Sequence, residues 1–498
     1  MWLRKLILII LFCGVPTWVW AQSLFVLPLP YPIDYLEKVP PVEETEITEE
    51  EEVPEAPPTE FAPLIPPDFK TQKAIGYEPG VTFKVPAGLR GKVDFWKQIY
   101  RHYSINEYVL HDMEYNLTYR SVNIEDIENK RIPYRSKRRL IGHRLGQEKR
   151  EIRALLSSVH EKQNNPDFMT KEERKIYDLF KNVNDPHKFS NARYRIRAQL
   201  GQKERFAQGI MWAGRYLPMM EKIFQEEGVP MELTRLPFVE SSFNIKARSK
   251  VGASGIWQFI RSTGKKFMSI NLAVDERNDP IEATRSAAKL FKMNYNMLQH
   301  WPLAVTAYNH GAGGMARAVK KVGTTDMVTI IGQYRSRTFG FASKNFYSEF
   351  LAALETELEY QKYFGQLKVE APLTFDEVDI SHYIGIHSLV RYTNTSKEVL
   401  KRYNPGLTNY VFTGKKFIPP GYRLKLPQGE SQGFLEAYNQ MPKGAVRETQ
   451  KKFTYHRVRK GDTLTYLARL YDTSVGEIKR ANRIGRFIYS GQLLVIPK

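Results

Sequence analysis

The chain has 498 residues, which is too long for one hydrophobic core and implies about three or four folded units with connecting segments. Hydrophobic residues make up 42% and aromatic residues 12%, and this composition excludes a protein that is disordered over most of its length. The formal net charge of +20 favours contact with polyanions such as nucleic acid, anionic lipid or acidic wall polymers, although a basic surface without a dedicated site explains it equally well.

Residues 1–21 have the pattern of a secretory signal peptide. Arg4 and Lys5 precede an apolar run, and Ala21 is a small residue at the expected cleavage position. The run is shorter than the ~20 residues that span a bilayer, so an uncleaved anchor is the less favoured alternative. We expect export across the inner membrane to the periplasm or cell envelope, with no membrane span in the mature chain. Cleavage would also remove Cys13, the only cysteine.

Two segments of contrasting composition follow. Residues 22–91 are expected to form a largely disordered acidic linker, because Pro and Glu dominate their central part and no apolar periodicity is present. Residues 92–200 are dense in Lys, Arg, Tyr and Leu, and Ile152, Leu156 and Val159 lie at helical spacing. We predict a basic helical region there and assign it no chemistry, because such charge runs are usually solvated faces.

Residues 201–360 carry clearer helix signals. Gly228 and Pro230 mark the end of one predicted helix. The spacing of apolar residues in 231–241 predicts a second helix directly afterwards. This second helix leaves Glu240 at or near its C-terminal end.

Two acidic residues precede a further predicted helix. Asp279, Pro280 and Glu282 are spaced as an N-cap, a first-turn proline and a reciprocal glutamate. These structural tasks account for the acidic side chains. We therefore interpret Asp275 as a turn residue and Asp279 as a cap, and not as catalytic partners of Glu240.

The C-terminal part contains two related patterns. Residues 453–498 read as strand, helix, helix and strand, with a turn before the first helix at 461–463. Residues 374–428 repeat this order in a weaker form. We predict two small α/β modules of βααβ type.

Three motifs carry a family resemblance. They are residues 240–244 (ESSFN), 249–259 (SKVGASGIWQF) and 307–311 (AYNHG), which agree with the family in type, order and spacing. At these residues the sequence resembles lytic transglycosylases of the membrane-bound murein transglycosylase D type. The resemblance covers roughly 201–354. It implies a mainly α protein with a goose-lysozyme-like helical catalytic domain of SLT type.

The resemblance also implies a mechanism and a set of site residues. Glu240 would be the single acid/base carboxylate that cleaves the β-1,4 bond between N-acetylmuramic acid and N-acetylglucosamine, leaving a 1,6-anhydromuramyl end. Ser249 and Gln258 would line the cleft, and Tyr308 and Asn309 would orient the sugar and the acid.

Elementary chemistry agrees with this role for Glu240. A carboxylic acid that protonates a glycosidic oxygen near neutral pH needs a raised pKa, and burial among apolar groups raises it. Leu236, Phe238 and Phe243 surround Glu240 in sequence. We therefore expect a sheltered carboxyl group.

Two positions depart from the family pattern. His310 stands where a small residue is common, and we interpret it as a satisfied or solvent-facing imidazole because it has no partner ligands for a metal. Phe346 stands where relatives often carry Tyr, which removes a hydrogen bond from the segment that closes the cleft.

The terminal module, 453–498, resembles a LysM glycan-binding module. The resemblance implies that N-acetylglucosamine units bind between its first strand–helix turn and its last helix–strand turn. The residues there are Gly461, Asp462, Thr463, Ile488 and Tyr489. Asp462 is equally well explained as a helix cap. The 374–428 module lacks the Gly-Asp-Thr turn, so sugar binding by it is left open.

Two other functions remain open. A goose-type lysozyme would hydrolyse the same bond with water, and a non-catalytic scaffold would keep the fold for binding peptidoglycan alone. We expect peptidoglycan glycan strands as the partner, no cofactor and no metal. No nucleic acid is expected, because no base-reading motif is present and the chain carries an export signal.

Overall fold

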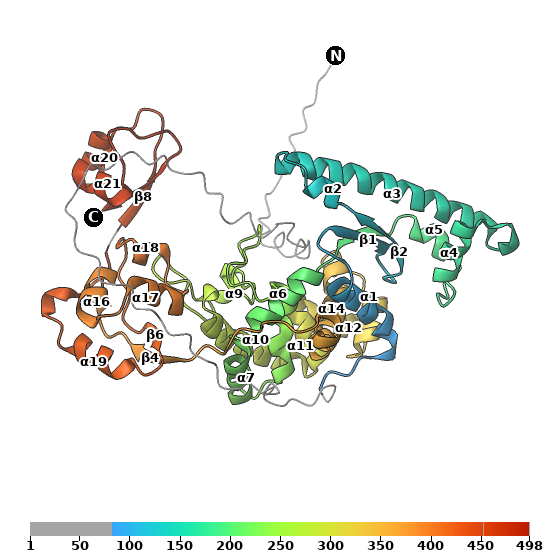
Figure 1. The fold of residues 1–498 in the computed structure, drawn as a ribbon, viewed down its shortest axis with the longest axis horizontal. Coiled ribbons are helices and arrows are strands. Elements are labelled where there is room, and N and C mark those ends of the chain that lie inside the picture. Colours follow the sequence, from blue (N-terminus) through green and yellow to red (C-terminus); the bar gives the residue numbers. More distant parts are fainter. Residues whose placement is uncertain (1–81, 452, 498) are drawn as a thin grey trace, which may run out of the picture. The chain divides into compact units, whose positions relative to one another are not determined.

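The computed structural model describes residues 82–451 and 453–497, and the expectations for the signal peptide and most of the linker lie outside this range. The chain is mainly helical (Figure 1). It divides into two compact units. Within the described residues, the first unit comprises 82–204 and 293–358, and the second comprises 205–292 and the chain from 359 onward. No helix in the described ranges is long and apolar enough to cross a membrane.

A three-stranded antiparallel sheet lies in the first unit. Its strands are β1 (Glu107–Asp112), β2 (Thr118–Asn123) and β3 (Ile196–Leu200), in the order β2-β1-β3. The prediction of a helical region at 92–200 did not include this sheet. Its strands are five or six residues long, and β3 joins β1 from about 80 residues further along the chain, so no local periodicity marks it.

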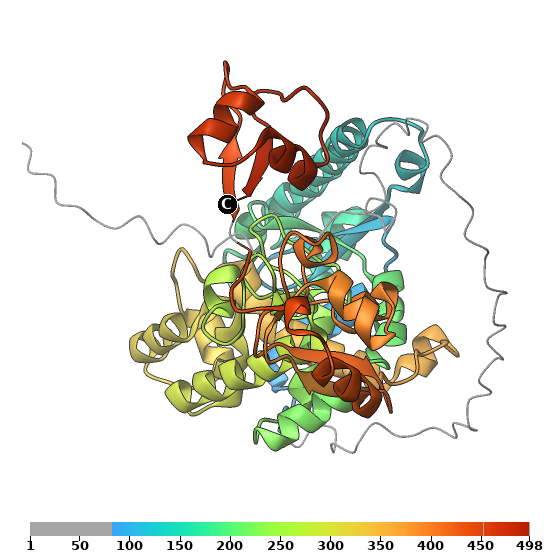
Figure 2. The same cartoon turned by 90° about the vertical axis from the view of Figure 1, so that its left-hand side faces the viewer.

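Helices make up most of the regular structure in the rest of 92–200. The longest is α3 (Tyr134–Lys162), a single helix of 29 residues (Figures 1 and 2). It buries Ile152, Leu156 and Val159, which confirms the predicted helical face. The shorter elements around it are α2 (Glu125–Glu128), η3 (Pro166–Phe168), α4 (Lys171–Leu179) and α5 (Lys188–Ala192).

The first helix begins inside the expected linker. The elements η2 (Ala87–Leu89) and α1 (Arg90–Arg101) already bury Leu89 and Trp96. Trp96 Nε1 donates to Asn345 Oδ1 at 3.1 Å on α14 (Phe341–Leu358). Residues 82–91 are therefore part of the folded unit that also contains α11 (Trp301–His310), α12 (Ala312–Val322) and α13 (Met327–Gln333).

The second unit is built around short helices. They are α6 (Lys203–Ala213), α7 (Leu217–Glu226), η4 (Met231–Arg235), α8 (Leu236–Glu240), α9 (Arg261–Gly264), η5 (Glu276–Asn278), α10 (Pro280–Leu298) and α15 (Tyr360–Phe364), of which α6 and α10 extend into the first unit at one end. Gly228 has a φ of 66° after α7, as the predicted helix stop requires. Asp279 Oδ1 accepts from the N–H groups of Ile281 and Glu282 at 3.0 and 3.3 Å, which confirms the cap.

The two C-terminal modules share one construction. In the first, β4 (Phe375–Asp379) pairs with β6 (Arg423–Pro427), and in the second, β8 (Phe453–Arg457) pairs with β9 (Leu493–Pro497), both antiparallel. The helices between them are α16 (Ile386–Thr393), α17 (Lys397–Tyr403) and α18 (Asn409–Phe412) in the first module, and α20 (Leu464–Leu470) and α21 (Val475–Asn482) in the second. The remaining elements are β5 (Tyr383–Ile384), α19 (Ser431–Asn439), η6 (Lys443–Ala445) and β7 (Val446–Arg447).

An asparagine fixes the last strand of each module in the same way. Asn482 donates to Val495 O at 2.7 Å and accepts from Val495 N at 2.8 Å. Asn404 makes the same pair of bonds to the backbone of Lys425, both at 2.8 Å. This shared pair of side-chain hydrogen bonds supports the interpretation of 374–428 as a repeat of 453–498.

Candidate active site

Glu240 is the last residue of α8. The predicted single helix over 231–241 is a 3₁₀ segment, η4, followed by one turn of α-helix. The guanidinium of Arg235, at the junction, pairs with the carboxylate of Glu221 on α7, and both side chains are almost wholly buried. This ion pair joins the segment that carries Glu240 to the neighbouring helix. This ion pair was not predicted from the sequence, because neither residue lies in a recognised motif.

The chain turns sharply directly after Glu240. Ser242 and Phe243 have φ values of 49° and 58°, in the left-handed region that non-glycine residues rarely adopt. The turn is held by packing, because the Phe243 ring lies against Phe238 with 4.7 Å between the ring centroids. It is also held by Ser241 Oγ, which donates to Ile256 O at 2.8 Å. Such strained backbone persists only where its surroundings fix it, and it is common at functional sites.

The Glu240 carboxyl group is sheltered from water without being neutralised by a partner. Its side chain is half-buried, and among the described residues none forms a hydrogen bond or ion pair with it. Burial raises the pKa of Glu240 to about 8 from the ordinary value of 4.5. The group is therefore protonated at neutral pH and available as an acid.

Ser249 and Gln258 lie on the loop that follows. The Ser249 hydroxyl accepts from Ala253 N at 2.9 Å and so closes the turn at 249–253. Gln258, with a φ of 48°, donates from Nε2 to Gly255 O at 2.8 Å and to Ala247 O at 3.2 Å. Both side chains thus hold the shape of this loop. The Gln258 Oε1 atom makes no hydrogen bond within the described part of the chain.

A buried arginine fixes the same loop from the other side. Arg277 makes two bonds to the Asp275 carboxylate, at 2.9 and 2.7 Å, and donates to Gly252 O at 2.7 Å and Phe259 O at 3.2 Å. At Gly255 a Cβ would lie 1.8 Å from Arg277 O, so only glycine fits there. Asp275 is therefore a structural residue, as predicted, and its partner was not predicted.

Tyr308 and Asn309 lie near the end of α11 in the first unit, and both are half-buried. Asn309 Oδ1 accepts from Ser343 Oγ on α14 at 3.0 Å. Ser343 Oγ also lies 3.3 Å from His310 Nδ1. His310 is buried against Phe339, and burial lowers its pKa. The imidazole of His310 thus lies within hydrogen-bond distance of a partner, which is one of the two environments predicted for it.

The residues proposed for glycan binding in 453–498 differ in their surroundings. Asp462 Oδ2 accepts from Arg459 N at 2.6 Å and lies 2.7 Å from His456 Nε2. Thr463 Oγ1 caps α20 by accepting from Tyr466 N at 3.1 Å, and the backbone of Gly461 turns with a φ of 96°. These contacts assign the side chains of Asp462 and Thr463 to the turn itself.

The last helix–strand connection of this module exposes aromatic rings. Tyr489 and Phe487 are each 71% exposed, while Ile488 between them packs against the core of the module. Phe487 was not predicted, although two aromatic residues close together beside a predicted turn are a local signal for an interaction surface. Across the described ranges, no group of three His, Cys, Asp or Glu side chains could hold a metal ion.

Two stretches of the chain match known families. Residues 219–331 match the transglycosylase SLT domain, and residues 456–497 match the LysM domain. The first stretch contains all five residues predicted from the motifs, which are Glu240, Ser249, Gln258, Tyr308 and Asn309.

Individual proteins are also similar to this chain. Membrane-bound lytic murein transglycosylase D from Escherichia coli K12 is 27% identical over 284 residues, and the match covers 55% of this chain and 61% of that protein. The protein of the same name from E. coli O6:H1 gives the same values. The chain therefore spans about three fifths of the length of these relatives. A solved structure of an inactive mutant of lytic transglycosylase Slt from Pseudomonas aeruginosa is 16% identical, covering 50% of this chain and 38% of that one, with a TM-score of 0.26.

Proposed function

We propose that this chain, which contains a transglycosylase SLT domain and a LysM domain, is a peptidoglycan lytic transglycosylase with Glu240 as its acid and base. One observation carries the proposal. A half-buried carboxyl group at the end of α8 has a pKa raised to about 8 by burial alone. An acid of this kind can protonate a glycosidic oxygen at neutral pH.

The proposed reaction has two proton transfers. Glu240 gives its proton to the bridging oxygen as the bond from C1 of N-acetylmuramic acid breaks, and the acetamido oxygen of the same sugar stabilises C1. The muramyl C6 oxygen then attacks C1 and its proton returns to Glu240. A C1–O6 bond replaces the C1–O4 bond, and no water is consumed.

The contacts of Asp275 and Asp279 favour substrate assistance over a second carboxylate supplied by either of them. Glycosidases of the usual kind need two free carboxyl groups. In the second unit, Asp275 is bound to Arg277 by two hydrogen bonds, and Asp279 lies 3.0 Å from Lys425 Nζ while it caps α10. The carboxylates of Asp275 and Asp279 therefore have structural roles. We assign Ser249 and Gln258 to the cleft wall, and Tyr308 and Asn309 to orienting the sugar.

The products of digestion separate this proposal from a goose-type lysozyme. We expect mass spectrometry of purified sacculi digested by the full chain to show muropeptides with 1,6-anhydromuramyl ends. Each lacks the mass of one water relative to the hydrolysed product, because the C6 hydroxyl and not water attacks C1. Digestion by a known muramidase is the control. Reducing ends alone would assign hydrolysis instead.

The rate of cleavage should fall in alkaline solution. Because Glu240 must be protonated to act as an acid and its pKa is about 8, we expect a plateau at neutral pH and a loss of about tenfold per pH unit above 8. The measurement is the initial rate of release of soluble muropeptides between pH 5 and 10. Sacculus binding at each pH is the control. An alkaline limb starting near pH 4.5 would contradict a raised pKa.

The LysM domain would hold the enzyme on its substrate. We assign the exposed Phe487 and Tyr489 and the turn at Gly461 to contact with N-acetylglucosamine units. Tethering raises the local concentration of glycan at the SLT domain. The periplasm or cell envelope is the compartment that fits this substrate.

A further inference from the structure

The first βααβ module is joined to the SLT domain by main-chain hydrogen bonds. Asp275 N donates to Gly406 O at 2.8 Å, and Thr408 N donates to Ala273 O at 2.9 Å. Thr408 Oγ1 adds a bond to Leu272 O at 2.5 Å. These bonds make a short antiparallel bridge between residues 272–275 and 406–408, and both segments belong to the second unit.

The two segments also share a hydrophobic core. Ala273 and Val274 are buried in the same cluster as Leu407 and the inward-facing residues of the module. They include Leu400, Leu424 and Leu426 of the module, and the cluster also contains Phe434 and Tyr438 of α19, which follows the module. A shared core means that the module and this part of the SLT domain are not independent bodies.

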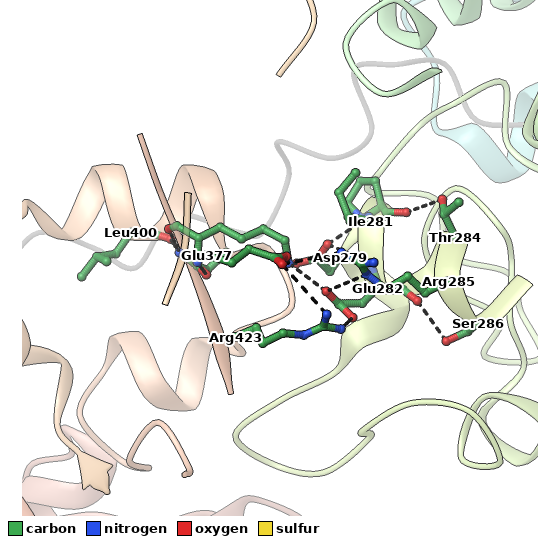
Figure 3. A network of polar contacts seen from close by, with 12 residues as sticks. Asp279, Ile281, Glu282, Thr284, Arg285, Ser286, Glu377, Leu400 and Arg423 are labelled. Carbon is green, nitrogen blue, oxygen red and sulfur yellow. Dashed lines mark hydrogen bonds and ion pairs between the residues drawn. The ribbon is translucent and has the colours of Figure 1, made fainter. Parts of the chain in front are cut away.

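A buried charge network closes the same junction. Lys425 on β6 is 1% exposed, and its Nζ lies 3.0 Å from Asp279 and 3.2 Å from Glu282, both on the first turn of α10 or its cap. Arg423 of the module pairs with the Glu282 carboxylate (Figure 3), and the carboxylate of Glu377, also in the module, lies 3.9 Å from Lys425 Nζ. A buried ammonium with two carboxylate partners is costly to break, because any partner left alone keeps a desolvated charge.

The junction involves the connection between helix and last strand that carries exposed side chains in the LysM domain. The asparagines Asn404 and Asn482 align the two modules, and each precedes the connection from the second helix to the last strand. In the LysM domain this connection exposes Phe487 and Tyr489. In the first module the start of this connection, at 406–408, is paired with the chain's own residues 272–275, and α18 follows before β6.

We infer that the 375–427 module is a positioning element of the catalytic lobe and not a second glycan-binding arm. Two residues, Asp275 and Arg277, connect the module to the loop that carries Gln258. The module holds the backbone of Asp275, whose carboxylate orients Arg277. Arg277 in turn holds Gly252 O and Phe259 O, at the two sides of the loop that carries Gln258. The inference rests on the proposed function, since it assigns a task in the same cleavage reaction.

The test is the full-length Lys425→Met variant. We expect kcat on soluble glycan strands to fall by about 10- to 100-fold with little change in KM, because small displacements of a site have effects of this size. Binding to sacculi should be unchanged, since the LysM domain is untouched. Hydrogen exchange at the amides of Asp275 and Thr408 should become faster. Lys425→Arg, which keeps the charge, should recover part of the rate.

The control is Lys222→Met, the same chemical change at an exposed lysine of α7 in the same unit. It should alter neither the rate nor the amide exchange. If Lys425→Met does not fold, Thr408→Val removes only the side-chain bond to Leu272 and should give a smaller change in the same direction.

Two results would overturn the inference. One is a Lys425→Met protein with unchanged kcat and weaker sacculus binding. The other is a chito-oligosaccharide that protects the amides of 406–408 from exchange in the wild-type protein. A wild-type protein that does not cleave glycan at all would instead refute the proposed function, and the exchange rates at Asp275 and Thr408 would still report whether Lys425 fastens the junction.

Discussion

Replacing Glu240 by Gln is expected to lower glycan cleavage by about 10²- to 10⁴-fold, the range measured for loss of a general acid or base. The amide fills the same space but cannot deliver a proton to the bridging oxygen. The measurement is the initial rate of muropeptide release from sacculi by the full chain. Sacculus pull-down should be unchanged, because the LysM domain is intact. An equally inactive wild type would favour the non-catalytic scaffold.

The same variant should be more stable than the wild type in alkaline solution. The pKa of Glu240 rises from 4.5 to about 8 on folding, so folding favours its protonated form. The stability associated with that form is complete below pH 4.5 and is lost as the pH rises through 8. Gln does not ionise and avoids this loss. We expect a higher melting temperature for Glu240→Gln at pH 9 and a much smaller difference at pH 4.5, as measured by calorimetry.

Local signals in the sequence predicted several structural features of the segments that carry the candidate site. The left-handed Gly228, the cap at Asp279 and the helix end at Glu240 each depend on a few neighbouring residues, and each is where the pattern predicts it. The βααβ modules were visible for the same reason, because each strand and helix has its own short pattern. The family motifs added the residues of α11 that no periodicity could single out.

Features that depend on distant contacts were not predicted. The sheet of β1, β2 and β3 needs strands far apart in the chain, and Lys425 meets its partner Asp279 across 146 residues. Arg277 lies close to Asp275 in sequence, but its role comes from the backbone oxygens of Gly252 and Phe259, which only the folded loop brings to it. A charged residue in a sequence does not reveal whether folding will bury it.

The buried pair of Arg235 and Glu221 should dominate the stability of the segment that carries Glu240. Both side chains are at most 1% exposed, so Arg235→Met removes the guanidinium from a desolvated Glu221 carboxylate. Loss of one member of a buried pair costs about 3–5 kcal/mol. We expect the free energy of unfolding from urea titration to fall by this amount, and glycan cleavage to fall with it because the base of α8 is no longer fixed.

The double variant Glu221→Met with Arg235→Met separates charge from packing. Because it removes both charges and keeps most of the apolar volume, it should recover most of the lost stability. Lys222→Met, which breaks an exposed pair with Glu226 on the same helix, should change the free energy of unfolding by less than about 1 kcal/mol. If the double variant is as unstable as the single one, the ion pair is not what joins α7 to η4, and the arginine stem must act through packing alone.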